Sequence, residues 1–183
     1  PLSVPEANPE VLKDAVDKAA ANAFEGDCAS LVKSPNCVTC GVVVALKALD
    51  VAFGVEDVSV TTFQSLSGRG DAKYPRDVVM GNVYPLHGTV ERTGEYQHGE
   101  LKRIMPDVKR VSVAAYRVPV QRGHLVDVRV TFRCATKPTA RDIETALSSF
   151  APLRDVPLPS KPRRVIYVKP LDEDEAGPRI GTP

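Results

Sequence analysis

One cysteine sits where a nucleophile could be activated. Cys37 follows the turn-forming residues Ser34, Pro35 and Asn36 and precedes the apolar run VTCGVVVALKAL. This pattern predicts a helix that begins near Cys37, and the free amides and dipole of a helix start favour a thiolate. A thiolate attacks carbonyl carbon readily. The competing interpretation is a small buried hydrophobe, which is the commoner role of a free cysteine.

Three further side chains lie in or beside predicted strands and suit the same chemistry. His124 opens a strand, and a histidine whose pKa is near about 6.5 can transfer protons at neutral pH. Arg117, seven residues earlier, could hold a carboxylate in a two-point contact. Gln64 could orient a carbonyl without adding charge. The competing interpretations are a surface histidine, a surface arginine within a strand and an ordinary polar strand end, respectively.

Two other short patterns, a CxxC pair and an SGRG segment, are weaker indications of a binding site. Cys37 and Cys40 form a CxxC pair, but the sequence has no second CxxC or HxxxH to complete a zinc site. A dithiol redox motif follows a different pattern of elements, so we expect no metal and a Cys40 that faces the core. The segment SGRG, which begins with Ser67 and Gly68, could cradle an anion on backbone amides. It lacks the third glycine of a dinucleotide-binding turn.

Composition limits the possible partners. The chain has 183 residues, of which 43% are hydrophobic and 26% charged, with a net charge of +1. This balance is typical of a globular domain and offers no basic surface for nucleic acid. No apolar run approaches the roughly 20 residues of a membrane span. The chain shows no signal-peptide pattern and has only four cysteines, so we expect a cytoplasmic protein with neither nucleic acid nor membrane as partner.

Apolar periodicity and turn residues predict four helices and four strands. The predicted helices run from Pro9 to a stop at Gly26, from Cys37 through the apolar run, from Glu95 to Met105, and from Thr139 or Asp142 to Phe150. The predicted strands are Val55–Phe63, Val108–Val120, His124–Cys134 and Val165–Pro170, with a turn at Gln121–Gly123. This order predicts an α+β fold: a mixed, mostly antiparallel sheet with helices on one face.

Four segments, taken in order, resemble the aspartate-semialdehyde dehydrogenase family, particularly its archaeal and fungal branch. VPEANPE resembles the segment that leads out of that family's nucleotide domain, and SPNCVTCG resembles its nucleophile motif. VTTFQSLSGRG and RVPVQRGH resemble its two later conserved segments, and the resemblance extends from residue 4 to about residue 150.

The resemblance implies a role for each residue. It implies that Cys37 attacks an acyl phosphate, or an aldehyde in reverse, that Gln64 holds the acyl intermediate, and that His124 acts as acid or base. Arg117 would bind the carboxylate of a small substrate, and Asn36 would lie beside the phosphate. NADPH would give or take the hydride, and two chains would pair through their sheets as a homodimer.

The chain also departs from the family pattern. Glu91 matches the acid of the family's substrate-binding GEEEK segment, but Thr93 falls near the position of its lysine. Ser67 and Gly68 are the residues expected to touch the cofactor, and a dinucleotide needs a fuller glycine-rich turn before a helix. We expect residues 1–36 to be a remnant of the nucleotide-binding domain with a linker helix, 37–170 the catalytic and dimerisation domain, and 171–183 an exposed tail.

The sequence therefore leaves three functions open. The first is NADPH-dependent reduction of an acyl phosphate of the aspartyl phosphate type to a semialdehyde, through a thioester on Cys37. The second is a repurposed family member with non-redox chemistry, such as a cyclase or lyase. The third is a domain that only mediates dimerisation. Retention of Gln64, Arg117 and His124 beside the cysteine favours an enzyme, since pairing of two sheets requires none of them.

Overall fold

The computed structural model describes residues 1–22, 31–68, 79–88, 91–156 and 162–169. Its helices are α1 (Pro9–Asn22), α2 (Cys37–Phe53), α4 (Thr93–Ile104) and α5 (Ala140–Ser149). Its strands are β1 (Val55–Gln64), β2 (Tyr84–Pro85), β3 (Arg110–Arg117) and β4 (Leu125–Phe132), and a short 3-10 helix, η2, covers Leu66–Gly68. Within these described ranges, no helix is both long and apolar enough to span a bilayer.

The four strands form one mixed sheet in the order β2-β3-β1-β4. β1 is parallel to β3 and antiparallel to β4, while β2 is antiparallel to β3. This arrangement confirms the predicted α+β class with a mostly antiparallel sheet. The segment from β3 to β4 does not close a hairpin, however, because β1 lies between those two strands. The segment instead crosses the end of β1, where the Leu66 amide donates a hydrogen bond to the Val120 carbonyl over 2.8 Å.

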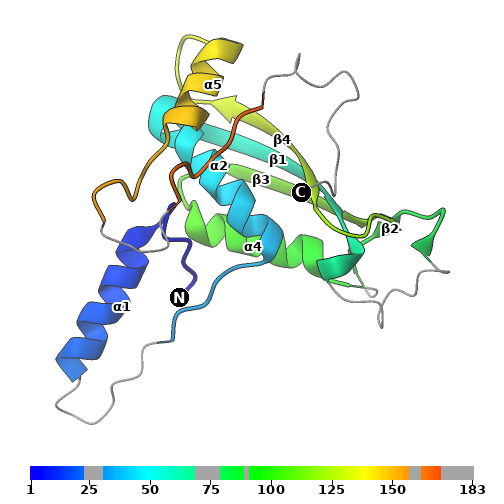
Figure 1. Cartoon of the computed structure of the whole chain (residues 1–183), viewed down its shortest axis with the longest axis horizontal. Coiled ribbons are helices and arrows are strands. Elements are labelled where there is room, and N and C mark those ends of the chain that lie inside the picture. Colours follow the sequence, from blue (N-terminus) through cyan, green and yellow to red (C-terminus); the bar gives the residue numbers. More distant parts are fainter. Residues whose placement is uncertain (23–30, 69–78, 89–90, 157–161, 170–183) are drawn as a thin grey trace.

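Helices α2 and α4 cover one face of this sheet (Figure 1). Val38, Val42, Leu46 and Leu49 recur at helical spacing along α2 and are all buried. They pack in one core with the inward-facing valines of the strands. Full burial of each such side chain contributes about 1.5–3 kcal/mol. The apolar face of α2 therefore fixes the helix on the sheet, and with it the position of the residues at the helix start.

The opposite face of the sheet is mostly polar, with aromatic residues at one end. Side chains alternate along a strand, so Ser59, Thr61 and Phe63 of β1 point away from α2. The ring of Phe63 stacks on Tyr116 of β3, with ring centroids 6.1 Å apart. The exposed Leu125 pairs with Phe63 in the register of β4.

One predicted strand is absent from the structure. The strand expected at Val165–Pro170 does not form, since its described residues have no strand partner and instead cross α2 on the side away from the sheet (Figure 1). There Val165 and Ile166 line a cavity together with Cys40 and Val44 of α2. Apolar side chains that cover a helix need no sheet partner, which explains why a strand-like composition misled the prediction. The predicted stop at Gly26 and the predicted tail at 171–183 lie outside the described residues.

Substitution of Gly54 should destabilise the fold. Gly54 ends α2 with a positive φ of 69°, and a Cβ there would lie 2.9 Å from Nε of Arg133. We expect Gly54→Ala to lower the free energy of unfolding by more than about 1 kcal/mol. Gly41→Ala is the matched control, because Gly41 is helical and a Cβ there would meet nothing within 4 Å. Gly41→Ala should raise the free energy of unfolding, measured in urea, by about 0.5–1 kcal/mol. Equal effects at both glycines would contradict this account.

Candidate active site

The candidate nucleophile lies at the first position of α2. Asn36 caps this helix, and its Oδ1 accepts the amide of Val38 over 3.0 Å. Asparagine is among the best capping residues because its side-chain oxygen satisfies an otherwise free amide. Cys37 is exposed at this helix start, and its Sγ lies 3.8 Å from Oδ1 of Asn36. The local sequence thus presents a thiol to solvent at the positive end of a helix.

An imidazole approaches this thiol from a distant part of the chain. Nε2 of His124 lies 3.6 Å from Sγ of Cys37, across 87 residues of sequence. His124 immediately precedes β4, which runs antiparallel to β1, so it lies at the edge where β1 ends. Both burial and the nearby charge of Arg117 lower the pKa of His124 from its ordinary value. Both effects favour the neutral form of the ring.

A buried ion pair lies near the imidazole. Arg117 ends β3 with 1% of its side chain exposed, and its Nη2 lies 3.6 Å from Oε1 of Glu91. Nη1 of Arg117 donates to the carbonyl of Ser65 over 2.7 Å, and the Thr93 hydroxyl donates to Glu91. A buried charge is tolerated when it is paired and hydrogen-bonded in this way. The site therefore offers a cation and an anion side by side.

The 3-10 helix η2 lies beside both the arginine and the histidine. A Cβ on Gly68 would lie 3.5 Å from Nη1 of Arg117 and 3.6 Å from Cε1 of His124. The hydroxyl of Ser67 lies 3.0 Å from the hydroxyl of Ser65. The backbone of η2 thus lies next to Arg117 and His124. Any side chain at residue 68 would enter the space beside these two residues.

Gln64 occupies the end of β1, in register with Arg117 of β3. Its side chain is buried, and its Nε2 donates to the hydroxyl of Thr62 over 3.1 Å. Contacts thus link Asn36, Cys37, His124, Arg117, Glu91 and Gly68 in one cluster. Gln64 lies beside this cluster at the strand end, with its amide bound to Thr62.

Two residues of α4 that sequence reasoning missed hold the helix start in place. Nε2 of Gln97 donates to Oδ1 of Asn36 over 3.0 Å. Oε2 of Glu100 accepts the backbone amide of Asn36 over 2.9 Å and the hydroxyl of Thr39 over 2.8 Å. Gln97 and Glu100 are spaced i, i+3, which places them on one helix face. This i, i+3 spacing in a segment predicted to be helical is the sequence feature that could have identified the two residues.

The second cysteine of the CxxC pair differs from the first. Cys40 is partly buried and packs against the core. Burial raises the pKa of the Cys40 thiol, and the neighbouring charges of Cys37 and Glu100 raise it further. Cys40 is therefore a poor nucleophile at neutral pH, because the thiolate is the reactive form.

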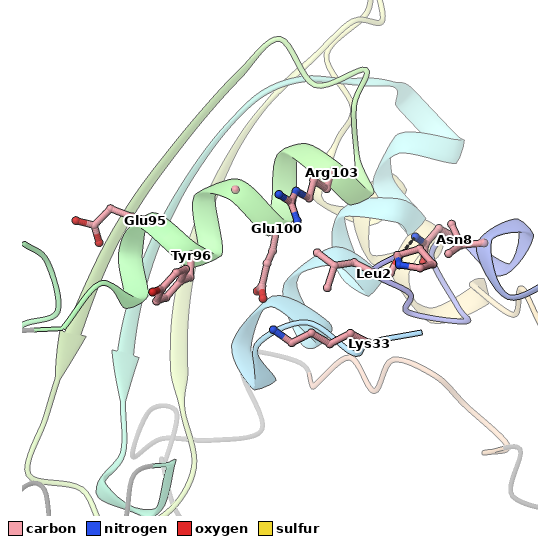
Figure 2. Close-up of a pocket in the computed structure, with 10 residues that line it drawn as sticks. Leu2, Asn8, Lys33, Glu95, Tyr96, Glu100 and Arg103 are labelled. Atoms are coloured by element: carbon pink, nitrogen blue, oxygen red, sulfur yellow. Dashed lines mark hydrogen bonds between the residues drawn. The ribbon is translucent and has the colours of Figure 1, made fainter. Parts of the chain in front are cut away.

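A cavity of about 680 Å³ opens on the outer side of α4, between that helix and the N-terminal segment (Figure 2). Leu2, Lys33, Tyr96, Glu100 and Arg103 are among the residues that line it. Glu100 belongs both to this lining and to the contacts of Asn36 described above. The lining includes neither Cys37 nor His124, so this cavity is separate from the thiol–imidazole contact.

Comparison with known proteins identifies the relatives of this chain. Residues 46–179 match the family described as semialdehyde dehydrogenase, dimerisation domain. The chain is 29% identical to aspartate-semialdehyde dehydrogenase of Rickettsia bellii over 94% of its own length and 54% of that protein's. It is 32% identical to the enzyme of Archaeoglobus fulgidus over 98% of its length and 51% of that protein's.

A solved structure gives the same relationship. The aspartate-semialdehyde dehydrogenase of Candida albicans, solved with NADP, superposes with a TM-score of 0.67 at 25% identity. The superposition covers 82% of this chain and 44% of that one. The chain thus spans about half the length of the relatives it matches.

Alkylation should distinguish the cysteines. We expect iodoacetamide to modify Cys37 several-fold faster than Cys40 or Cys134 at neutral pH, because Cys37 is exposed at a helix start while the other two are partly buried. Peptide mass spectrometry after timed quenching measures each rate. Cys37→Ser should remove the fast phase and leave the slow ones. Equal, slow labelling of all the cysteines would refute the nucleophile assignment.

Proposed function

Because this chain belongs to the semialdehyde dehydrogenase family through the dimerisation domain that matches its residues 46–179, we propose that it forms the catalytic and subunit-pairing part of an NADPH-dependent aspartate-semialdehyde dehydrogenase. The observation that carries the proposal is the 3.6 Å approach of the Cys37 sulfur to Nε2 of His124 at a helix start. The proposed reaction is reduction of an acyl phosphate of the aspartyl phosphate type to a semialdehyde. The protein would act in the cytoplasm.

The first step uses only residues of this chain. The Cys37 thiolate attacks the carbonyl carbon and forms a C–S bond, and phosphate leaves with the electron pair of the C–O bond. A thioester results. Asn36, whose Oδ1 is held by Val38 and Gln97, would direct its amide nitrogen to the phosphate. Gln64 at the adjoining strand end would hold the acyl oxygen.

The ion pair of Arg117 and Glu91 supports recognition of a zwitterionic substrate. A guanidinium binds a carboxylate in a two-point contact, and a carboxylate binds an ammonium group. The two side chains lie 3.6 Å apart, which is close enough to address the two groups carried on one α-carbon. A small substrate with an amino-acid head group therefore fits this pair, with its acyl phosphate directed to Cys37.

NADPH would supply the hydride that reduces the thioester. The described residues near Cys37 supply only the three-residue 3-10 helix η2, Leu66–Gly68, which is less than the glycine-rich turn and helix start that bind a pyrophosphate. Ser67 and Gly68 would touch only the reactive end of the cofactor. The resemblance assigns the nucleotide domain to the part of the relatives that precedes this chain's segment.

The 3.6 Å approach of Cys37 to His124 also fits a second candidate, a non-redox catalyst that uses these two residues without NADPH. Thr93, near the position where the resemblance expects a lysine, is consistent with altered substrate binding, because its hydroxyl donates to Glu91 instead. Calorimetry with NADPH tests the second candidate. Micromolar binding of NADPH by the 183-residue chain would exclude it, whereas absence of binding is expected of both candidates, because the resemblance assigns the nucleotide domain to another part of the relatives.

The match to a dimerisation domain supports pairing of two copies. We further propose that they pair through the sheet face that carries Phe63, Tyr116 and Leu125. Aromatic and apolar side chains on a sheet face that α2 and α4 leave uncovered fit burial against a second sheet.

Acylation provides the direct test of the proposed chemistry. We expect succinyl phosphate, an acyl phosphate with a carboxylate, to add one acyl group to Cys37 in the absence of NADPH. Intact mass spectrometry should show the adduct, hydroxylamine should remove it, and Cys37→Ser should lack it. Acetyl phosphate, which has no carboxylate for Arg117, should react more slowly. An adduct on another residue, or none, would refute the proposal.

Oligomeric state tests the pairing surface. We expect the chain to sediment as a dimer and Phe63→Asp to sediment as a monomer, because burial of an unpaired carboxylate costs several kcal/mol. Glu144→Lys, on the exposed side of α5, is the control and should remain dimeric. A dimer that survives Phe63→Asp would rule out this face, as would a monomeric parent chain at micromolar concentration.

A further inference from the structure

The hydrogen bond to Nδ1 of His124 determines where its proton resides. The backbone amide of Ser65 donates to Nδ1 over 3.0 Å. A backbone N–H can only donate, so Nδ1 must present its lone pair. In a neutral imidazole the proton then lies on Nε2, the nitrogen that is 3.6 Å from the Cys37 sulfur.

The same contacts disfavour a second proton on the ring. An imidazolium carries N–H on both nitrogens, and an Nδ1–H would oppose the N–H of Ser65. The carbonyl of Ser65 meanwhile accepts Nη1 of Arg117 over 2.7 Å, which holds a positive charge beside the ring. Ser65 is fully buried, so its two backbone groups hold the histidine and the arginine in a fixed relation. Burial and the charge of Arg117 lower the pKa of His124 accordingly.

A second histidine provides an internal comparison. Nε2 of His87 accepts the backbone amide of Ala115 over 3.1 Å. In the neutral ring the proton then lies on Nδ1, which is 3.9 Å from a carboxylate oxygen of Glu95. The chain thus contains two histidines whose backbone donors select opposite tautomers.

We propose that Ser65 is a positioning residue that fixes His124 as a neutral Nε2–H donor, so that His124 polarises the reacting carbonyl and does not take the proton of Cys37. The catalytic part of this inference rests on the proposed function, whereas the tautomer does not. The exposed thiol loses its proton to solvent. When the thiolate forms the C–S bond, the carbonyl π electrons move to oxygen, and Nε2–H donates a hydrogen bond to that oxygen. No proton leaves the ring, and a neutral imidazole is known to be suited to this role.

Nitrogen NMR reads the tautomer directly. We expect the 183-residue chain, labelled with 15N in its histidine rings, to show His124 protonated on Nε2 and unprotonated on Nδ1 at neutral pH. His87 should show the opposite pattern in the same spectrum, and the His124→Gln variant identifies the His124 signals by their loss. Ser65→Ala should leave the His124 pattern unchanged, because the backbone N–H remains and only the hydroxyl, 3.3 Å from Nδ1, is removed. An Nδ1–H tautomer, an imidazolium, or averaging between tautomers would overturn the proposal.

Two substitutions of His124 separate a donor from a base. Glutamine retains an N–H donor and cannot accept a proton, whereas alanine retains neither function. If His124 is a donor, His124→Ala should slow acylation of Cys37 by succinyl phosphate roughly 100-fold, and His124→Gln should recover at least roughly tenfold of that loss. Equal loss in the two variants would overturn the donor role. If the parent chain forms no acyl adduct at all, the proposed function fails, and the NMR result still decides the tautomer.

Discussion

The site depends on the position of β1 between a parallel and an antiparallel neighbour. Because β3 runs parallel to β1, Arg117 ends its strand next to Gln64. Because β4 runs antiparallel to β1, its first residues return to that same edge and bring His124 there. Three polar side chains from separate parts of the chain thus reach one edge of the sheet through backbone pairing alone. The start of α2 is the only further element needed to bring a thiol to them.

Backbone groups and caps then orient these side chains. Asn36 caps α2 and is held by α4, while both backbone groups of Ser65 are bound, one to His124 and one to Arg117. Side chains anchored to backbone lose little freedom when a substrate binds, which is the condition for a preorganised site. The sheet edge brings the functional groups together, and these hydrogen bonds determine which atom each group presents.

Local patterns in the sequence predicted the elements well where a cap or an apolar period marked them. Asn36 and the apolar run after it predicted α2, and Thr139 or Asp142 was predicted to start the helix that is α5, where Thr139 is the N-cap. The sequence could not show that β1 separates β3 from β4, because strand order depends on long-range pairing. The contacts of Ser65 were likewise invisible, since they use backbone atoms that every residue has. The predicted strand at 165–170 failed because its apolar residues cover a helix.

The contact between Cys37 and His124 is the central claim, and a chemical shift measures it most directly. The ring signals of His124 should be recorded by NMR before and after Cys37 alone is carbamidomethylated. With the sulfur 3.6 Å from Nε2, modification should shift the Nε2 and Cε1 signals of His124 strongly. Alkylation of Cys134 in the Cys37→Ser variant should leave them in place. Unchanged His124 signals after complete modification of Cys37 would contradict the account.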